Sequence, residues 1–333
     1  MTAQKSFFVL GEVRDGRIHS VTRELTGKAR ELADSVGGRV TTVLLSGGLA
    51  DSPEDLFRYG ADRVLSVEHP SMTLYNQEIE TNVLAHILRE EQPEVVLAGA
   101  TTSGRTTLPA LAAKLETGLT ADCTGLEMDL ETGLLLQTRP AIGGNVMATI
   151  KTPERRPQMA TVRPRTFRIP EPSERKGELL TPGIPAALFE SSIENLGFDR
   201  VEDGAANIAD MDVVVSGGKG LKRPESFRML EELAELLGGG VGASRPTVEA
   251  KWMDYPHQVG LSGKVVAPKV YIAAGISGAV QHLAGMQTAG YIVAINRDPD
   301  ASIFRVADLG LRGDLFDIIP RIIDRIKTEV NSR

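Results

Sequence analysis

Short apolar runs alternate with longer amphipathic segments along the first third of the chain, and this alternation constrains the fold more than any other feature. The runs FFVLG, RVTTVLL, RVLSV and EVVLAG have the length of buried strands, and residues 20–36, 53–60 and 75–91 have helical spacing. Strands that alternate with helices form βαβ units around a mainly parallel sheet. The sequence therefore predicts an α/β domain of Rossmann-like type at the start of the chain.

The alternation stops after Arg105. GLLLQTRP, GGNVMATIKT and QMATVRPRTFRI are typical of strands separated by turns, and we expect hairpins that complete or flank the first domain. Residues 164–186 contain five prolines and many charges, which favours an extended arm over a packed element. We place the first domain, with its arm, at residues 1–205.

A second series of strands and helices begins near residue 211. MDVVVSGG, KVYIAAG and YIVAIN are strand candidates, and PESFRMLEELAELLGGG has leucines at helical spacing. The last helix is expected to begin near Asp314 or Asp317, and the second choice places Pro320 in its first turn. Since 333 residues exceed one typical core, we predict two domains, each a mainly parallel sheet flanked by helices, with the second at residues 206–333.

Composition excludes several classes of protein. The formal net charge of −7 disfavours nucleic acid as a partner. The apolar runs are too short for a signal peptide or a membrane span, so we expect a cytoplasmic protein without membrane insertion. Cys123 is the only cysteine, which excludes an intrachain disulfide and argues against a cysteine-based metal site.

Four glycine-rich loops punctuate the second domain. They are SGGKG (216–220), GASR (242–245), HQVGLSG (257–263) and GISGAVQH (275–282). Each loop alone could be a plain tight turn, and none matches the GxGxxG or Walker A pattern. Ligands in open α/β sheets, however, bind beyond the carboxyl ends of the strands, where such loops lie. We therefore expect the four loops to meet at one ligand crevice.

Residue types around this crevice favour binding of a cofactor over attack on a substrate. The N–H groups of residues 277–280, at a helix start, and the charges of Lys219 and Arg245 predict an anion site suited to a phosphate. The helix dipole near His282 favours a neutral ring that donates one N–H, although a lone histidine is also common as an ordinary surface or core residue. GxSxG, HExxH and CxxC are absent from the sequence, so no catalytic residue is expected.

Two long segments resemble the C-terminal domain of the electron transfer flavoprotein alpha-subunit family. They are GASRPTVEAKWMDYPHQVGLSGKVVAPKVYIAAGISGAVQHLAGM and YIVAINRDPDASIFRVADLGLRGDLFDIIP. In the first domain, VLAGATTSGRTTLPALAAKL, TGLTADCTGLEMD, TRPAIGGNVMATI and RPQMATVRP are similar to the same family. The resemblance implies a heterodimer with a beta subunit, which the first domain and its arm would contact, and an FAD-binding second domain. The FAD would relay single electrons between a donor (a beta-subunit flavin, NADH or an acyl-CoA dehydrogenase) and a partner dehydrogenase or quinone reductase.

The resemblance assigns individual residues to the FAD. They are Lys219, Ser244, Arg245, Val259, Gly260, Leu261, Ser262, Ser277, Gly278, Ala279, Val280, Gln281, His282, Asn296, Asp314 and Leu315. Asn296 and Asp314 would lie toward the adenosine end. Arg245 and His282 would stabilise the negative charge that reduction adds to the flavin ring.

Three of these positions differ from the common family pattern. Lys219 replaces an arginine, Leu261 replaces a glutamine, and Ser262 replaces a threonine whose hydroxyl lies near flavin N5. A hydroxyl donor is kept, and we expect the potential of the flavin to differ.

Family members are either simple carriers or bifurcate electrons from NADH with a flavin of the beta subunit. TGLTADC, RPAIGGNVMA and RPQMATVRP resemble the bifurcating versions from anaerobic bacteria. This implies a second FAD in the beta subunit, where a simple carrier has AMP, and ferredoxin or flavodoxin as a further partner. NADH-dependent activity is then expected only of the heterodimer. Two other interpretations stay open: an NAD-dependent enzyme that uses the same C-terminal domain, and a scaffold without a cofactor.

Overall fold

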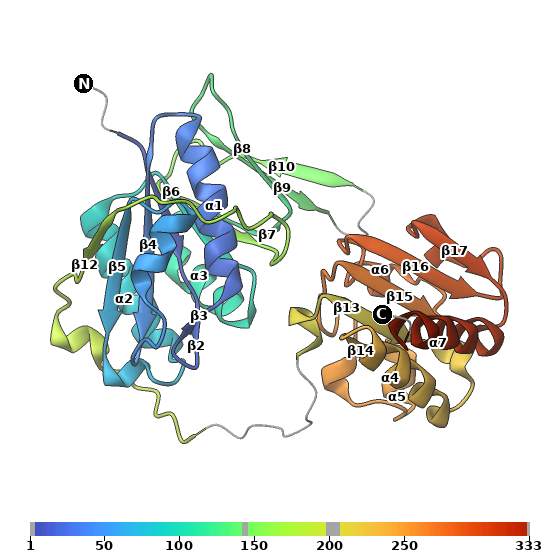
Figure 1. Ribbon diagram of the computed structural model, residues 1–333. Helices are drawn as coiled ribbons and strands as arrows, with labels where there is room; N and C mark the ends of the chain where they lie inside the picture. Colours follow the sequence, from blue (N-terminus) through green and yellow to red (C-terminus); the bar gives the residue numbers. More distant parts are fainter. Residues whose placement is uncertain (1–3, 142–145, 198–206, 332–333) are drawn as a thin grey trace. The chain divides into compact units, whose positions relative to one another are not determined.

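The described residues form two compact units. The computed structural model describes residues 4–141, 146–197 and 207–331, and the chain divides into Met1–Phe198 and Asp199–Arg333 (Figure 1). The predicted boundary between residues 205 and 206 lies outside the described residues. Each unit contains a parallel sheet with helices packed on it, which confirms the predicted α/β class.

The first unit is built on a seven-stranded sheet in the order β12-β5-β4-β1-β6-β11-β7, in which neighbouring strands pair in parallel. The strands are β1 (Ser6–Leu10), β4 (Arg39–Ser46), β5 (Arg63–Glu68), β6 (Val95–Gly99), β7 (Leu119–Cys123), β11 (Gln158–Val162) and β12 (Glu178–Leu180). The helices are α1 (Ser20–Asp34), α2 (Gln77–Glu91) and α3 (Thr102–Lys114). The predicted helical segment 53–60 is a short 3₁₀ helix, Pro53–Tyr59, which ends at a left-handed Gly60.

Burial along β1 explains why helices cover both faces of this sheet. Phe7 and Val9 pack into the core beneath α1, whereas Phe8 and Leu10 pack with α2 and α3. Successive side chains of a strand point to opposite faces, so an unbroken apolar run requires cover on both sides. Figure 1 shows α1 in front of the sheet in this view. A two-stranded ribbon, β2 (Val13–Arg14) with β3 (Arg17–Ile18), follows β1.

The hairpin predictions for the middle of the first unit are correct for two segments and wrong for the third. Strands β8 (Gly125–Met128), β9 (Leu135–Pro140) and β10 (Met147–Ile150) form an antiparallel sheet in the order β10-β9-β8. Strand β11, in contrast, is a central parallel strand between β6 and β7. All five of its residues are buried, so it belongs to the doubly covered sheet and not to a half-exposed hairpin.

The predicted arm, residues 164–186, is partly packed on the first unit. Residues Glu178–Leu180 extend the main sheet as β12, parallel to β5. Near the start of the arm, the buried carboxylate of Glu24 accepts from the backbone N–H groups of Arg165 and Phe167 at 2.8 and 2.9 Å. The expectation of an arm that is not a packed element is therefore wrong for these parts.

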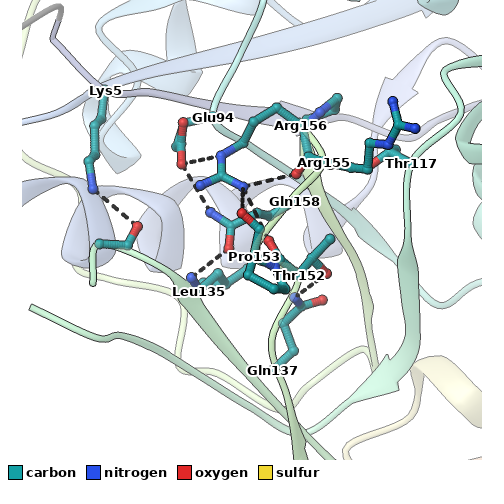
Figure 2. Close-up of polar contacts among 12 residues, drawn as sticks. Lys5, Glu94, Thr117, Leu135, Gln137, Thr152, Pro153, Arg155, Arg156 and Gln158 are labelled. Carbon is teal, nitrogen blue, oxygen red and sulfur yellow. Dashed lines mark hydrogen bonds and ion pairs between the residues drawn. The ribbon is translucent and has the colours of Figure 1, made fainter. Parts of the chain in front are cut away.

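A polar network around the buried Gln158 joins the antiparallel sheet to the main sheet (Figure 2). The Gln158 side chain, 0% exposed at the start of β11, accepts from the N–H of Leu135 in β9 at 2.8 Å and donates to Glu94 at 3.2 Å. Arg156 donates to the same Glu94 oxygen at 2.5 Å and also to three backbone carbonyls. Because buried polar groups need partners, this network fixes where β9 lies against the main sheet.

Glu80 of α2 makes the stability of the first unit depend on pH. Its carboxylate accepts from Thr107 Oγ1 of α3 at 3.2 Å, and burial, aided by the charge of Glu12, raises the pKa of Glu80 from 4.5 to about 7. Because this pKa is raised on folding, stability falls as the pH rises from 4.5 to about 7. The substitution Glu80→Gln, which mimics the protonated acid, should raise the free energy of unfolding by about 2 kcal/mol at about pH 8 and change it little at about pH 5. Denaturant unfolding at both pH values measures this, and equal differences at the two would contradict it.

The second unit is built on a five-stranded parallel sheet in the order β14-β13-β15-β16-β17. The strands are β13 (Val213–Gly217), β14 (Gly240–Ala243), β15 (Val270–Ala274), β16 (Tyr291–Asn296) and β17 (Leu309–Arg312). The helices are α4 (Phe227–Leu236), α5 (Arg245–Glu249), α6 (Val280–Leu283) and α7 (Leu315–Asn331). Helices α4 and α7 pack on one face, and loop residues around Val259, Ile276 and Ile303 cover the other, against Tyr271 of β15.

The last helix begins at the first of its two predicted starting points. Asp314 Oδ1 accepts from the N–H of Phe316 at 3.0 Å, so Asp314 caps α7 and Pro320 lies inside the helix, beyond its first turn. Among the described residues, no helix is both long and apolar enough to cross a membrane.

Candidate cofactor-binding site

The strand order of the second unit creates a crevice at the carboxyl ends of β13 and β15. Numbered along the chain, the sheet has the order 2-1-3-4-5, so the chain leads from β13 to β14 on one side and from β15 to β16 on the other. Ligands in such sheets bind at this switch point. A cavity of about 460 Å³ lies there, within the usual size of small-molecule sites.

Most of the predicted site residues surround this cavity or a small hollow beside it. The cavity is lined by Lys219, Ser244, Arg245, Val259, Gly260, Leu261, Ser262, Ser277, Ala279, Gln281, His282 and Asn296. The hollow, of about 40 Å³, is lined by Asn296, Asp314 and Leu315 among others. The two spaces adjoin, because Gly220, Gly275 and Asn296 line both. Together they form an elongated site.

Gly278 and Val280 line neither space. Val280 is 49% exposed at the start of α6. Gly278 has φ +86°, and a Cβ there would collide with the backbone of Ile303. The structure therefore gives Gly278 a packing role: the turn after β15 can lie against the 302–303 backbone only without a side chain.

Three charged residues at the site were not predicted. Asp298 lines the cavity, and Lys222 and Arg297 line the hollow. Arg297 directly follows the predicted Asn296, and Lys222 lies three residues beyond Lys219. The sequence feature that could have indicated these residues is their position just after the end of a strand. Lys222 and Arg297 extend the positive charge along the site.

Two glycines form the floor between the cavity and the hollow. The N–H of Gly220 donates to the carbonyl of Gly275 at 3.0 Å, which joins the loop after β13 to the loop after β15. A Cβ on Gly220 would lie 2.6 Å from the Gly275 Cα. The backbones of these loops touch, so the floor has no room for side chains.

The loop between Gln258 and Lys264 prepares the Ser262 hydroxyl to act as a donor. Gln258, which is 4% exposed, donates from Nε2 to Ser262 Oγ at 3.1 Å, and Tyr255 donates to the Ser262 carbonyl at 2.8 Å. A hydroxyl that already accepts a hydrogen bond keeps its own proton for another partner. Leu261 beside it is 71% exposed, so this edge of the site faces solvent.

The helix expected to start at residues 277–280 is a single turn in the structure. Helix α6 spans only Val280–Leu283, and the N–H groups of Gly285 and Met286 bond to carbonyls three residues back, as in successive tight turns. The Gly285 carbonyl accepts from the N–H of Val266. One helical turn has little macrodipole, so the structure gives the predicted dipole effect on His282 little support.

His282 is neutral because it is buried. The side chain is 6% exposed and its Nε2 lies 2.9 Å from the Tyr271 hydroxyl. Burial lowers the pKa of His282 from 6.5 to about 4, a shift that the Val259 backbone opposes. Nδ1 is shielded from water and has no hydrogen-bond partner among the described residues. The expected neutral ring is therefore present, for a different physical reason.

The predicted cations and Asn296 already have partners within the unit. Arg245 Nε lies 2.8 Å from Glu249 Oε1, and both side chains are more than half exposed. Lys219 Nζ lies 4.3 Å from the centroid of the Trp252 ring. Asn296 Nδ2 donates to the Ile276 carbonyl at 2.9 Å and so supports the turn after β15. Within the described ranges, no group of three or more His, Cys, Asp or Glu is arranged to hold a metal ion.

Comparisons with known proteins give the same result for both units of the chain. A model described as "Electron transfer flavoprotein domain" matches residues 7–183, and one described as "Electron transfer flavoprotein FAD-binding domain" matches residues 207–287. Electron transfer flavoprotein subunit alpha of Thermoanaerobacterium thermosaccharolyticum is 47% identical over 98% of this chain and 99% of its own, and that of Clostridium acetobutylicum is 42% identical over 98% of each. Lactate dehydrogenase (NAD(+),ferredoxin) subunit LctC of Acetobacterium woodii is 42% identical over 96% of this chain and 76% of its own. The chain belongs to the electron transfer flavoprotein alpha-subunit family.

Proposed function

We propose that the second unit binds one FAD along the cavity and the adjoining hollow, and that the chain works as the alpha subunit of a heterodimer that relays single electrons. The observation that carries this proposal is the buried, unpartnered Nδ1 of the neutral His282 at the cavity wall. A buried polar atom without a partner costs stability, and an acceptor atom of a bound cofactor would satisfy it. The matched FAD-binding domain, residues 207–287, supports the choice of flavin.

The residues present fit an FAD in chemistry. Bound FAD supplies the redox chemistry, and the protein sets its potential through nearby charges and hydrogen bonds. Lys219 at the cavity, with Lys222 and Arg297 at the hollow, provides positive charge for a diphosphate. The free proton of Ser262 is a donor for an acceptor atom of the ring. Each of these groups binds or orients; none attacks a substrate.

We propose a beta subunit as the permanent partner, with electrons arriving from its flavin, from NADH or from an acyl-CoA dehydrogenase. The acceptor would be a second dehydrogenase or a quinone reductase. Electron bifurcation with ferredoxin or flavodoxin is the variant that we favour, because the LctC relative carries NAD(+) and ferredoxin in its name. In that variant the beta subunit holds a second FAD, and in a simple carrier it holds AMP.

Co-purification of this chain with the beta subunit tests the function. We expect a yellow heterodimer, and FAD released from it can be counted per complex together with AMP. Two FADs and reduction by NADH would support bifurcation, whereas one FAD with AMP would support the simple carrier. A colourless complex that binds NAD would overturn the FAD proposal in favour of a nucleotide-dependent enzyme. A colourless complex that gains no thermal stability from FAD or NAD would support the interpretation as a scaffold without a cofactor.

Arg245 and Glu249 should shift the potential of the bound flavin in opposite directions. Reduction adds negative charge, so Arg245→Ala should lower the potential by on the order of tens of mV, since half-exposed charges act through a high effective dielectric. Glu249→Gln removes the carboxylate that offsets Arg245 at 2.8 Å and should raise the potential. A reductive titration of each purified heterodimer measures both shifts, and shifts of the same sign would contradict the assignment.

A further inference from the structure

Three buried polar groups lie together below the wall of the cavity, on β13, β15 and α6. Tyr271 is 0% exposed, His282 is 6% exposed, and Ser216 is 0% exposed. Only His282 lines the cavity; Tyr271 and Ser216 lie behind it. The hydrogen bond between Tyr271 and His282 is shielded from water, so the choice of donor within it decides which nitrogen of His282 carries the proton.

The pairing of Tyr271 with His282 restricts the proton on the histidine ring. The Tyr271 hydroxyl lies 2.9 Å from His282 Nε2, and a neutral imidazole carries one proton, on either nitrogen. If Tyr271 donates, Nε2 is the acceptor and the proton is on Nδ1. If Nε2–H donates instead, the buried Tyr271 proton needs another acceptor, and Nδ1 becomes an acceptor.

Two observations favour Tyr271 as the donor. Burial raises the pKa of Tyr271, so the phenol keeps its proton. The geometry gives the Tyr271 hydroxyl a hydrogen bond to His282 Nε2, whereas Ser216 Oγ has no hydrogen-bond partner among the described residues, so Nε2 is the acceptor in place for the Tyr271 proton. Both observations therefore favour the Nδ1–H tautomer.

The rigidity of Tyr271 makes it suited to this task. It is a fully buried residue of β15, which pairs with β13 on one side and β16 on the other. Its ring packs in the core with Val259 and Ile276, which also belong to the loops at the cavity. A hydroxyl held on a central strand fixes the ring it contacts better than a loop residue does.

We propose that Tyr271 is a positioning residue of the cofactor site: its hydroxyl donates to Nε2 of His282 and fixes the tautomer that presents an N–H, on Nδ1, to an acceptor atom of the bound flavin. The role of that N–H rests on the function proposed above, whereas the Tyr271–His282 pair does not. Tyr271 touches no cofactor in this scheme, and acts only through His282.

The test compares Tyr271→Phe with the matched control Ser216→Ala in the purified heterodimer. With ¹⁵N-labelled histidine, long-range ¹H–¹⁵N spectra report which nitrogen of His282 carries the proton, and a His282→Asn protein identifies its signals. In the native protein we expect an Nδ1–H ring. Tyr271→Phe should move both ring signals toward the average of the two tautomers and release FAD about threefold to tenfold faster, as for the loss of one hydrogen bond. Ser216→Ala should leave the ring signals unchanged, because Ser216 is not the acceptor of the Tyr271 proton in this scheme.

Two outcomes would overturn the proposal. One is a native spectrum with the proton on Nε2; the other is a Tyr271→Phe protein whose His282 signals and FAD release match the native protein. In the His282→Asn background, where the amide supplies a donor without help, Tyr271→Phe should no longer change FAD release. A heterodimer that lacks FAD in this subunit would contradict the proposed function instead, and the ring spectra would still report on the pair.

Discussion

If the second unit binds FAD as proposed, replacing Gly275 by alanine should remove it. Gly275 has φ +63°, and a Cβ there would lie 2.8 Å from both the Gly220 Cα and Leu315 Cδ2. The left-handed backbone costs an alanine about 1–2 kcal/mol, and the contacts add about 1–3 kcal/mol unless the loops separate. Separation of the loops breaks the floor shared by the cavity and the hollow. We therefore expect FAD affinity to fall at least about thirtyfold, measured as FAD retained by the heterodimer after gel filtration.

Gly238→Ala is the matched control for this substitution. Gly238 has φ +64°, almost the same as Gly275, but no atom lies within 4 Å of the position of its Cβ. Located after α4, it does not line the cavity or the hollow. Gly238→Ala should lower the free energy of unfolding by a similar backbone contribution, because the left-handed backbone is the same, and the heterodimer should keep its FAD. Hydrogen–deuterium exchange of β13 and β15 shows whether the Gly275→Ala unit stays folded, and native FAD retention in that protein would contradict the floor assignment.

The location of the site was predictable because it follows from sheet topology. Apolar runs mark the parallel strands, glycines mark the turns after them, and ligands bind beyond the carboxyl ends. Lys219, Gly260 and His282 lie far apart in the sequence, and they line one cavity in the structure because each follows or adjoins a strand end. This reasoning needs only periodicity and turn chemistry, which a single sequence contains.

What the sequence did not reveal depends on partners that are set by tertiary packing. Tyr271 belongs to the apolar run KVYIAAG, and nothing local indicates that its hydroxyl meets a histidine eleven residues later. Similarly, Gln158 opens an ordinary apolar strand, but its buried amide joins two sheets. The sequence also did not indicate the length of α6, and the turns that follow it are held by the N–H of Val266, which donates to the Gly285 carbonyl. In each case a distant residue decides the local structure.

The second large effect concerns an ion pair in the first unit whose arginine is buried. Asp122 at the end of β7 accepts from Arg163 in two hydrogen bonds, of 2.6 and 3.2 Å, and Arg163 is 6% exposed. Although burial alone would raise it, the pKa of Asp122 is lowered by Arg163, with a smaller contribution from Arg105. A buried charge that loses its partner typically costs 3–5 kcal/mol. Asp122→Asn keeps the shape and tolerates the left-handed backbone, φ +60°, so it removes little besides the charge.

We expect Asp122→Asn to lower the free energy of unfolding by about 3 kcal/mol at neutral pH, because the Arg163 charge stays buried without a counter-charge. Adding Arg163→Met should recover part of this loss, since the double variant buries no charge at that position. Asp129→Asn is a matched control: its partner Lys151 is 45% exposed and can be hydrated, so the effect should be much smaller. Because the folded pKa of Asp122 is depressed, its contribution is present above its ordinary pKa of 3.8 and is lost as the pH falls through the lower folded value. Denaturant unfolding measures these differences, and hydrogen–deuterium exchange of β7 and β11 locates them. If the double variant is less stable than Asp122→Asn alone, Arg163 stabilises the unit through contacts other than this ion pair.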